Sequence, residues 1–112
     1  MGKLVYAESD LNISFEDRAL THLQIVIGEL LRQNHGFYFS WKDDPAVGDG
    51  RSSVWLHPAI PMYFKYDGSR VPAINREWLS ALRKTAESGT GLIFIAEPGE
   101  PFGRTAPPRS HV

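Results

Sequence analysis

An apolar stripe with the period of an α-helix runs through residues 15–34. Its members recur at steps of three and four, and they are Leu20, Leu23, Ile27 and Leu30. The residues between them form a polar face that comprises Arg18, His22, Glu29, Arg32 and Gln33. Ser14 is a favourable N-cap, and Gly36 can adopt the left-handed conformation that often ends a helix. The pattern predicts one amphipathic helix over residues 15–34.

Apolar and polar residues then alternate with the period of a β-strand in three successive segments. These segments are residues 37–42, 53–57 and 62–67, joined by a polar loop over residues 43–51 and by a corner between Pro58 and Pro61. Strands that follow one another through short links usually pair, so the three segments predict an antiparallel meander. Two shorter segments, residues 4–7 and 11–14, predict a hairpin before the helix.

A second helix and a buried strand complete the pattern. Asn75 is a suitable N-cap for a helix over residues 76–87, whose inward side chains are Trp78, Leu79, Leu82 and Ala86. Residues 91–96 are apolar on both faces, as in a strand with neighbours on either side. The predicted order is ββαβββαβ. We expect an α+β fold, namely a two-layer sandwich in which two helices cover one face of a mostly antiparallel sheet of about six strands.

The length of the chain, 112 residues, fits a single domain, which we place at residues 1–97. Residues 98–112 contain the prolines at positions 98, 101, 107 and 108 and few apolar side chains. Such a segment buries little surface, so it predicts a flexible tail.

Composition changes this picture mainly by exclusion. The chain has no cysteine, which excludes disulfides, thiolate zinc sites and a cysteine nucleophile. A formal net charge of −1 gives no overall attraction to nucleic acid or anionic membranes. Glu8 and Asp10 interrupt the N-terminal apolar residues before a signal peptide can form, and no apolar stretch reaches the roughly 20 residues that span a bilayer. We expect a cytoplasmic protein with no membrane partner.

No metal site is predicted. The four histidines, His22, His35, His57 and His111, lack the spacing of metal ligands, and His57 precedes a proline turn where a structural role is expected. Three aspartates, Asp43, Asp44 and Asp49, share one loop but lack the closing glutamate of a calcium-binding loop. We expect that loop to be solvated.

One hexapeptide carries a candidate chemistry. Lys65-Tyr66-Asp67-Gly68-Ser69-Arg70 fits Lys-x-Asp-Gly-x-Arg and resembles the nucleotide-binding motif of ATP-dependent DNA ligases and related nucleotidyltransferases. The resemblance implies Lys65 as the adenylated nucleophile, Arg70 as a contact to the nucleotide, and ATP and Mg as cofactors. An amine attacks only when it is unprotonated, so such a lysine needs desolvation or a neighbouring cation.

The chain also departs from that family. Position 63, which is usually acidic there, is Tyr63, and the residues after Lys65 lack both the metal-binding carboxylates and the Lys-x-Lys pair of the later motifs. Nucleotidyl transfer depends on positioned phosphates and stabilised charge, so a nucleophile alone is insufficient. The same residues also fit a structural interpretation, in which Lys65 is an outward residue on a strand and Tyr66-Asp67-Gly68-Ser69 is a hairpin-type turn.

The chain as a whole resembles a family of short actinobacterial proteins that are often labelled ATP-dependent DNA ligase. The likeness covers roughly residues 1–97 and is carried by the segments 23–28 (LQIVIG), 39–44 (FSWKDD), 48–51 (GDGR) and 54–58 (VWLHP). It implies a name rather than a demonstrated activity.

The outward side of the predicted meander combines aromatic rings with cations. Its members are Tyr38, Ser40, Lys42, Ser53, Trp55, His57, Tyr63, Lys65 and Asp67, with Arg51 and Arg70 at strand ends. Bases can stack on such rings while cations hold phosphates. Alternatively, cross-strand aromatic pairs stabilise an exposed sheet face or meet a second subunit.

We therefore expect a small non-enzymatic binding domain that uses no cofactor. Its expected contact residues are Tyr38, Lys42, Arg51, Trp55, His57, Tyr63, Lys65 and Arg70. The expected partner is a nucleic acid, another protein or a second copy of the chain. The alternative is a ligase-like nucleotidyltransferase in which Lys65 is adenylated.

Overall fold

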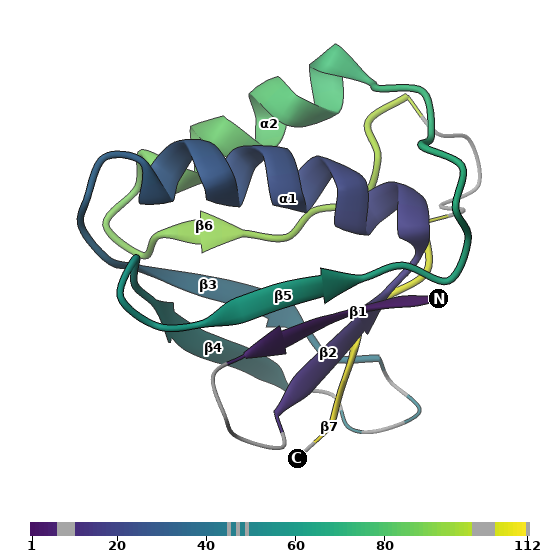
Figure 1. Cartoon of the computed structure of the whole chain (residues 1–112), viewed down its shortest axis with the longest axis horizontal. Helices are drawn as coiled ribbons and strands as arrows, with labels where there is room; N and C mark the ends of the chain where they lie inside the picture. The colour runs from purple at the N-terminus through teal and green to yellow at the C-terminus, as the bar shows by residue number, and fades with distance from the viewer. Residues whose placement is uncertain (7–10, 45, 47, 49, 100–104, 112) are drawn as a thin grey trace.

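Two helices lie on one side of two small β-sheets in the computed structural model of the chain (Figure 1). The structure describes residues 1–6, 11–44, 46, 48, 50–99 and 105–111. The helices are α1 (Asp17–Leu31) and α2 (Arg76–Ala86). The strands are β1 (Gly2–Tyr6), β2 (Asn12–Phe15), β3 (Phe37–Lys42), β4 (Arg51–Leu56), β5 (Met62–Lys65), β6 (Leu92–Ile93) and β7 (Arg109–His111). The α+β class and the order ββαβββαβ are confirmed, and β7 follows as a further strand.

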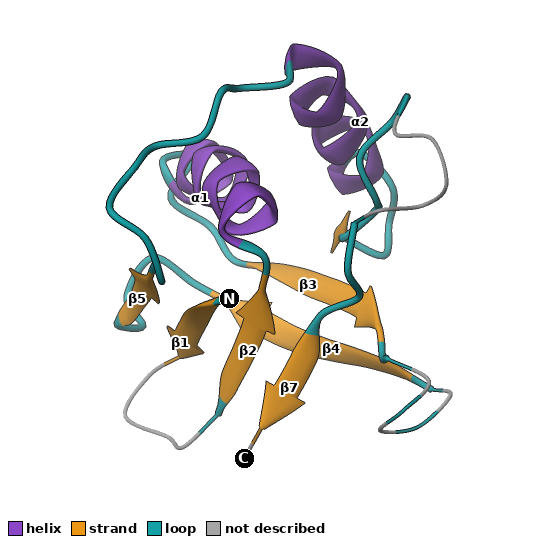
Figure 2. Ribbon diagram, turned by 90° about the vertical axis from the view of Figure 1, so that its right-hand side faces the viewer, coloured by secondary structure: helices purple, strands orange, loops and turns teal. Residues whose placement is uncertain are grey.

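The strands divide between two sheets rather than forming the single sheet that was expected. One sheet has the order β5-β1-β2-β7 and is antiparallel throughout. The other has the order β4-β3-β6, with β6 parallel to β3. Figure 2 shows β3 and β4 running across the direction of β1, β2 and β7.

The expected meander of β3, β4 and β5 is therefore wrong at its last strand. β5 pairs with β1, so that Tyr63 lies opposite Val5 and Lys65 opposite Lys3. The chain leaves β4 through a turn in which the Ile60 amide donates to the His57 carbonyl oxygen over 3.0 Å. Pro58 and Pro61 fix the backbone of this corner and offer no N–H for a ladder, so β5 does not fold back onto β4.

The hydrophobic core fills the space between the two sheets and the helices. Leu4, Ile13 and Phe15 contribute from the first sheet, and Phe39, Trp41 and Leu56 contribute from the second. The rings of Phe15 and Phe39 meet across this space with centroids 6.1 Å apart. Strands β3 and β4 therefore bury one face and leave the other for solvent or a partner.

The two ends of α1 differ from their predicted form. Ser14 is buried in β2, and the N-cap is Glu16, which makes no side-chain cap hydrogen bond. At the other end the left-handed residue is Asn34, with φ of 63°, rather than Gly36. In α2, by contrast, the predicted cap is confirmed: the Asn75 side chain accepts hydrogen bonds from the amides of Glu77 and Trp78.

His22 lies in the core and not on the predicted polar face of α1. Its Nδ1 is 2.7 Å from the Arg18 carbonyl oxygen, and its Nε2 is 2.8 Å from the Asn75 amide nitrogen. A carbonyl only accepts and an amide N–H only donates, so the ring is neutral with its proton on Nδ1. Burial lowers the pKa of His22, in agreement with that assignment.

Part of the segment predicted to be a flexible tail forms a strand. β7 pairs with β2, and Arg109 contacts Asp44 over 2.9 Å. Residues 100–104 and Val112, which belong to the same predicted tail, lie outside the described residues. No helix within the described part of the chain is both long and apolar enough to cross a lipid bilayer.

Candidate functional site

The outer surface of β3 and β4 brings together four of the predicted contact residues. We call this surface the aromatic face and define it by the outward side chains Tyr38, Ser40, Lys42, Arg51, Ser53 and Trp55. The register places Tyr38 opposite Trp55, Ser40 opposite Ser53 and Lys42 opposite Arg51. The alternation of the two strands turns these six side chains outward because Phe39, Trp41 and Leu56 are drawn into the core.

Tyr38 and Trp55 form the centre of the aromatic face. Their ring centroids are 5.0 Å apart in an edge-to-face arrangement, and the two residues remain 53% and 44% exposed. The backbone of Gly36 supports the indole, because a Cβ at this position would overlap the Trp55 ring. The Tyr6 hydroxyl donates to the Trp55 carbonyl oxygen and ties β1 to β4. The aromatic pair is therefore held in place while half of its surface stays open.

A hollow of about 290 Å³ on this surface has Tyr38 and Arg51 among its lining residues. It is lined by Tyr38, Ser40, Arg51, Ser52, Ser53 and Thr90. The hydroxyls of Ser40 and Ser53, which both line the hollow, lie 2.8 Å apart, so they can exchange their mutual hydrogen bond for one to a ligand. Rings, hydroxyls and cations thus follow one another along a single surface.

The remaining predicted contact residues are not part of this surface. Tyr63 is exposed on β5 in the other sheet, and Arg70 lies in the segment after β5. His57 belongs to the turn after β4, where its Nδ1 accepts a hydrogen bond from the Ala59 amide over 3.0 Å. The expectation of one continuous contact surface is therefore wrong, because β5 belongs to the sheet of β1.

Lys65, the candidate nucleophile, is exposed at the end of β5. Its neighbour across the ladder is Lys3, which is exposed as well. Neither lysine lines any of the three hollows described for this chain. Lys65 therefore stands in solvent, outside any described hollow that could desolvate its amine for nucleophilic attack.

The turn that follows Lys65 is held by a single carboxylate of α1. Asp17 accepts hydrogen bonds from the backbone amides of Asp67 and Gly68, over 3.1 and 2.8 Å. Burial alone would raise the pKa of the Asp17 carboxyl, but these two amides outweigh it, and the pKa lies below its ordinary value. The Asp-Gly pair therefore lies in a bend that Asp17 holds in place. The expected hairpin-type turn is wrong, because β5 pairs with the earlier strand β1 and an irregular segment follows the bend.

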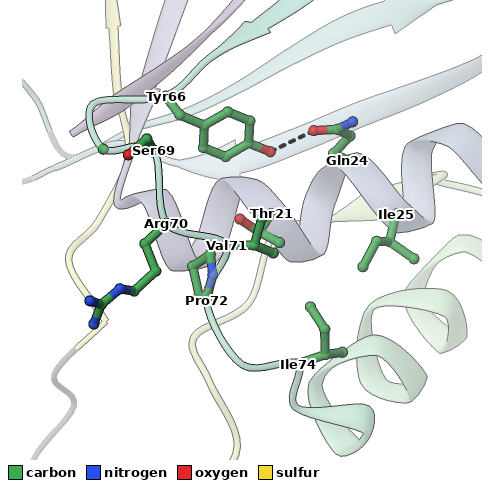
Figure 3. A pocket seen from close by; sticks show the side chains of 10 residues that line it. Thr21, Gln24, Ile25, Tyr66, Ser69, Arg70, Val71, Pro72 and Ile74 are labelled. Atoms are coloured by element: carbon green, nitrogen blue, oxygen red, sulfur yellow. Dashed lines mark hydrogen bonds between the residues drawn. The ribbon is translucent and has the colours of Figure 1, made fainter.

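A second hollow, which the sequence did not predict, lies between α1 and residues 66–74. Its volume is about 430 Å³, and it is lined by Thr21, Gln24, Ile25, Tyr66, Gly68, Ser69, Arg70, Val71, Pro72 and Ile74 (Figure 3). The Tyr66 hydroxyl donates to the Gln24 side-chain oxygen over 2.6 Å. Burial raises the pKa of Tyr66. The sequence feature that could have indicated this hollow is the pair of apolar residues Val71 and Ile74 near Pro72, outside any predicted helix or strand.

The described residues contain no group of three or more histidine, aspartate or glutamate side chains that could hold a metal ion. In the polar loop, Asp43 accepts from the Ser52 hydroxyl and Asp44 pairs with Arg109. Asp49, the third aspartate of this loop, lies outside the described residues.

Comparison with known proteins identifies a family but no annotated relative. No curated protein and no solved structure matches the chain. Residues 1–97 match a family described as a domain of unknown function (DUF7882). That description names neither ligase chemistry nor a source organism, so those expectations stay predictions. Because the match covers most of the sequence, the chain belongs to the DUF7882 family.

Proposed function

We propose that the protein is a non-enzymatic binding domain whose contact surface is the aromatic face of β3 and β4. The observation that carries this proposal is the Tyr38–Trp55 pair, two large rings that are ordered by their neighbours and yet about half exposed. Tyrosine and tryptophan provide most of the binding energy at many interfaces, since they bury much area at little cost in side-chain entropy.

Charge on the aromatic face favours an anionic partner. Lys42 and Arg51 lie opposite each other beyond Ser40 and Ser53, and both are exposed. The face itself contains no carboxylate among its six residues. The net charge of −1 has little effect on the attraction of an anion to the aromatic face, because salt screens charges that are more than about 8 Å away.

Rings and cations on one sheet surface are suited to a single nucleic-acid strand. Bases stack on tyrosine and tryptophan, and lysine and arginine hold the phosphates that follow. We therefore propose single-stranded nucleic acid as the partner. A second copy of the chain, which would also cover the rings, is the outcome that the experiment below separates from it.

The test is fluorescence anisotropy with a labelled 20-nucleotide single strand at two salt concentrations. Trp55→Ala is expected to weaken binding about tenfold, because stacking contributes roughly 1–3 kcal/mol per base. Lys42→Gln and Arg51→Gln are each expected to lower the slope of log affinity against log salt by about one. Circular dichroism and a thermal melt verify that each variant is folded.

Tyr63→Ala is the matched control. Tyr63 is as exposed as Tyr38 but lies on β5 in the other sheet, so its loss should leave the affinity unchanged. Equal losses in Trp55→Ala and Tyr63→Ala would contradict a specific role for the aromatic face. Sedimentation velocity on the same samples identifies the other outcome: concentration-dependent dimers that vanish in Trp55→Ala, without strand binding, would assign the face to self-association.

The ligase-like alternative gains no support from the geometry. Lys65 is exposed, and its nearest described neighbour across the ladder is another lysine in solvent. We therefore do not propose ATP or Mg as ligands of this site.

A further inference from the structure

The hollow between α1 and residues 66–74 is separate from the aromatic face and has no part in the function proposed above. On one side Thr21, Gln24 and Ile25 follow each other along one face of α1. On the other side Val71, Pro72 and Ile74 face the helix from an irregular segment. Figure 3 shows the side chains of Ile25 and Ile74 extending toward the space between helix and segment.

Apolar side chains that line this hollow are exposed to solvent. Val71 is 77% and Ile74 is 41% exposed, and the two residues stand at the same rim. A volume of about 430 Å³ falls within the roughly 300–1,000 Å³ of pockets that bind small molecules. Exposed apolar residues around a hollow of this size are typical of a ligand site.

Polar groups are few and lie at the edges of the hollow. The Tyr66 hydroxyl and the Gln24 amide bond to each other at one end. Arg70 stands at the rim, where its side chain points away from the apolar walls (Figure 3). Within the part of the chain that the structure describes, the Arg70 guanidinium has neither an ion pair nor a hydrogen bond. No carboxylate lines the hollow.

From this arrangement we infer that the hollow binds a small organic anion with an apolar body. The body lies between Ile25, Val71 and Ile74, and the anionic head group remains at the rim beside Arg70. This division keeps the charge hydrated, so the ligand does not incur the cost of burying an ion. Hydrophobic contact then provides the affinity, and the arginine selects the sign of the charge.

A third hollow, which shares Ile74 with this one, contains a further cation without an ion pair among the described residues. It is lined by Ile74, Arg76, Leu79, Ser80 and Arg83. Arg83 is engaged by both carboxylate oxygens of Glu29, over 2.7 and 2.8 Å, whereas Arg76 has no ion pair among the described residues. Arg70 and Arg76 are therefore two cations, one lining each hollow, that form no ion pair among the described residues.

The experiment uses octanoate as the probe and octanol as its uncharged counterpart. Both are titrated into ¹⁵N-labelled protein at low salt, and amide shifts are followed by NMR. Octanoate is expected to shift amides in residues 21–25 and 66–74 and to bind about threefold more tightly than octanol, as expected of one exposed charge contact. No shift in these residues up to the solubility limit would overturn the inference, as would shifts spread over the whole chain.

Two variants and one control locate the contacts. Arg70→Gln should remove the preference for octanoate and leave octanol binding unchanged. Ile74→Ser should weaken both ligands about threefold or more, because it removes apolar surface from the site. Arg51→Gln, which alters the aromatic face, should change neither affinity, so the two proposals fail independently. If Arg70→Gln binds octanoate as tightly as the wild-type protein does, the charged part of the site is refuted.

Discussion

Gly91 shows how one residue places β6 beside β3. Its φ is +86°, and a Cβ at this position would overlap the carbonyl oxygen of Tyr38. A left-handed conformation costs a residue other than glycine about 1–2 kcal/mol, and the overlap is with backbone that cannot move without disturbing β3. We therefore expect Gly91→Ala to lower the free energy of unfolding by about 2–4 kcal/mol, measured by urea denaturation.

Gly28 provides the control for that substitution. It lies inside α1, and a Cβ there would meet nothing within 4 Å. Alanine is the better helix former, so Gly28→Ala should raise the free energy of unfolding by about 0.5–1 kcal/mol. Equal urea midpoints for Gly91→Ala and the wild-type protein would mean that β6 does not approach Tyr38 as described.

At the residue scale, the sequence predicts what is decided locally. Asn75 caps α2 through amides two and three residues ahead, and the pattern of residues 75–78 alone indicates it. His22 is different, because its burial depends on Asn75 and on the ring of Trp78, whose centroid is 4.6 Å away. These partners lie more than fifty positions further along the chain, and only the folded structure brings them to α1.

At the element scale, Glu97 joins α1, α2 and the segment after β6. Its carboxylate accepts two hydrogen bonds from Arg18, over 2.8 and 2.6 Å, and one from the Asn75 amide group over 2.7 Å. The Arg18 guanidinium, helped by Asn75, holds the pKa of Glu97 at about 2. The shift from 4.5 corresponds to about 3 kcal/mol at full strength, and the partial exposure of Arg18 reduces that to about 2 kcal/mol.

The sign of the resulting pH dependence follows from the direction of the shift. A depressed carboxyl pKa stabilises the fold above pH 4.5, and that stability is lost as the pH falls from 4.5 toward 2. The lowered pKa of His22 adds a loss that begins as the pH falls below its ordinary 6.5, because the buried ring must gain a charge. Glu97→Gln should lower the free energy of unfolding by about 2 kcal/mol at pH 7. It should also weaken the dependence of this free energy on pH below pH 4.5, and leave the dependence above pH 4.5 unchanged. Urea midpoints measured from pH 7 to pH 2.5 test this, and an unchanged slope below pH 4.5 would contradict the contact with Arg18.

The limits of sequence interpretation are clearest for β3 and β5. The bounds of β3, Phe37–Lys42, agree with the predicted segment because the alternation of buried and exposed residues depends only on the strand itself. The partner of β5 depends on the corner at Pro58–Pro61 and on β1, which precedes it by more than fifty residues. That long-range pairing divided the predicted contact surface, leaving Tyr38, Lys42, Arg51 and Trp55 together and moving Tyr63 and Lys65 to the other sheet.

At the scale of the whole molecule, the two candidate sites belong to different elements. The aromatic face is built on β3 and β4, which pair along their whole length over the buried rings of Phe39 and Trp41. The hollow is formed by α1 and an irregular segment that is attached through Asp17 and through the hydrogen bond between Tyr66 and Gln24. A rigid sheet suits a fixed contact surface, whereas a segment held by a few hydrogen bonds can adjust around a small ligand.

The contribution of residues 98–112 can be tested by truncation after Glu97. Residues 1–97 provide the core side chains Leu4, Phe15 and Phe39, so the truncated chain is expected to fold. It loses β7, the hydrogen bond from the Ala106 amide to the Glu16 carboxylate, and the ion pair between Arg109 and Asp44.

Loss of β7 turns β2 into an edge strand with unpaired backbone groups, which water then hydrates at a net cost. We expect a decrease of about 1–3 kcal/mol in the free energy of unfolding and faster amide hydrogen exchange in β2 than in β1. Arg109→Gln in the full chain removes only the ion pair and should leave exchange in β2 near the wild-type rate, which separates strand pairing from charge. Equal melting temperatures for the truncated and full chains would show that β7 adds no stability to the sheet.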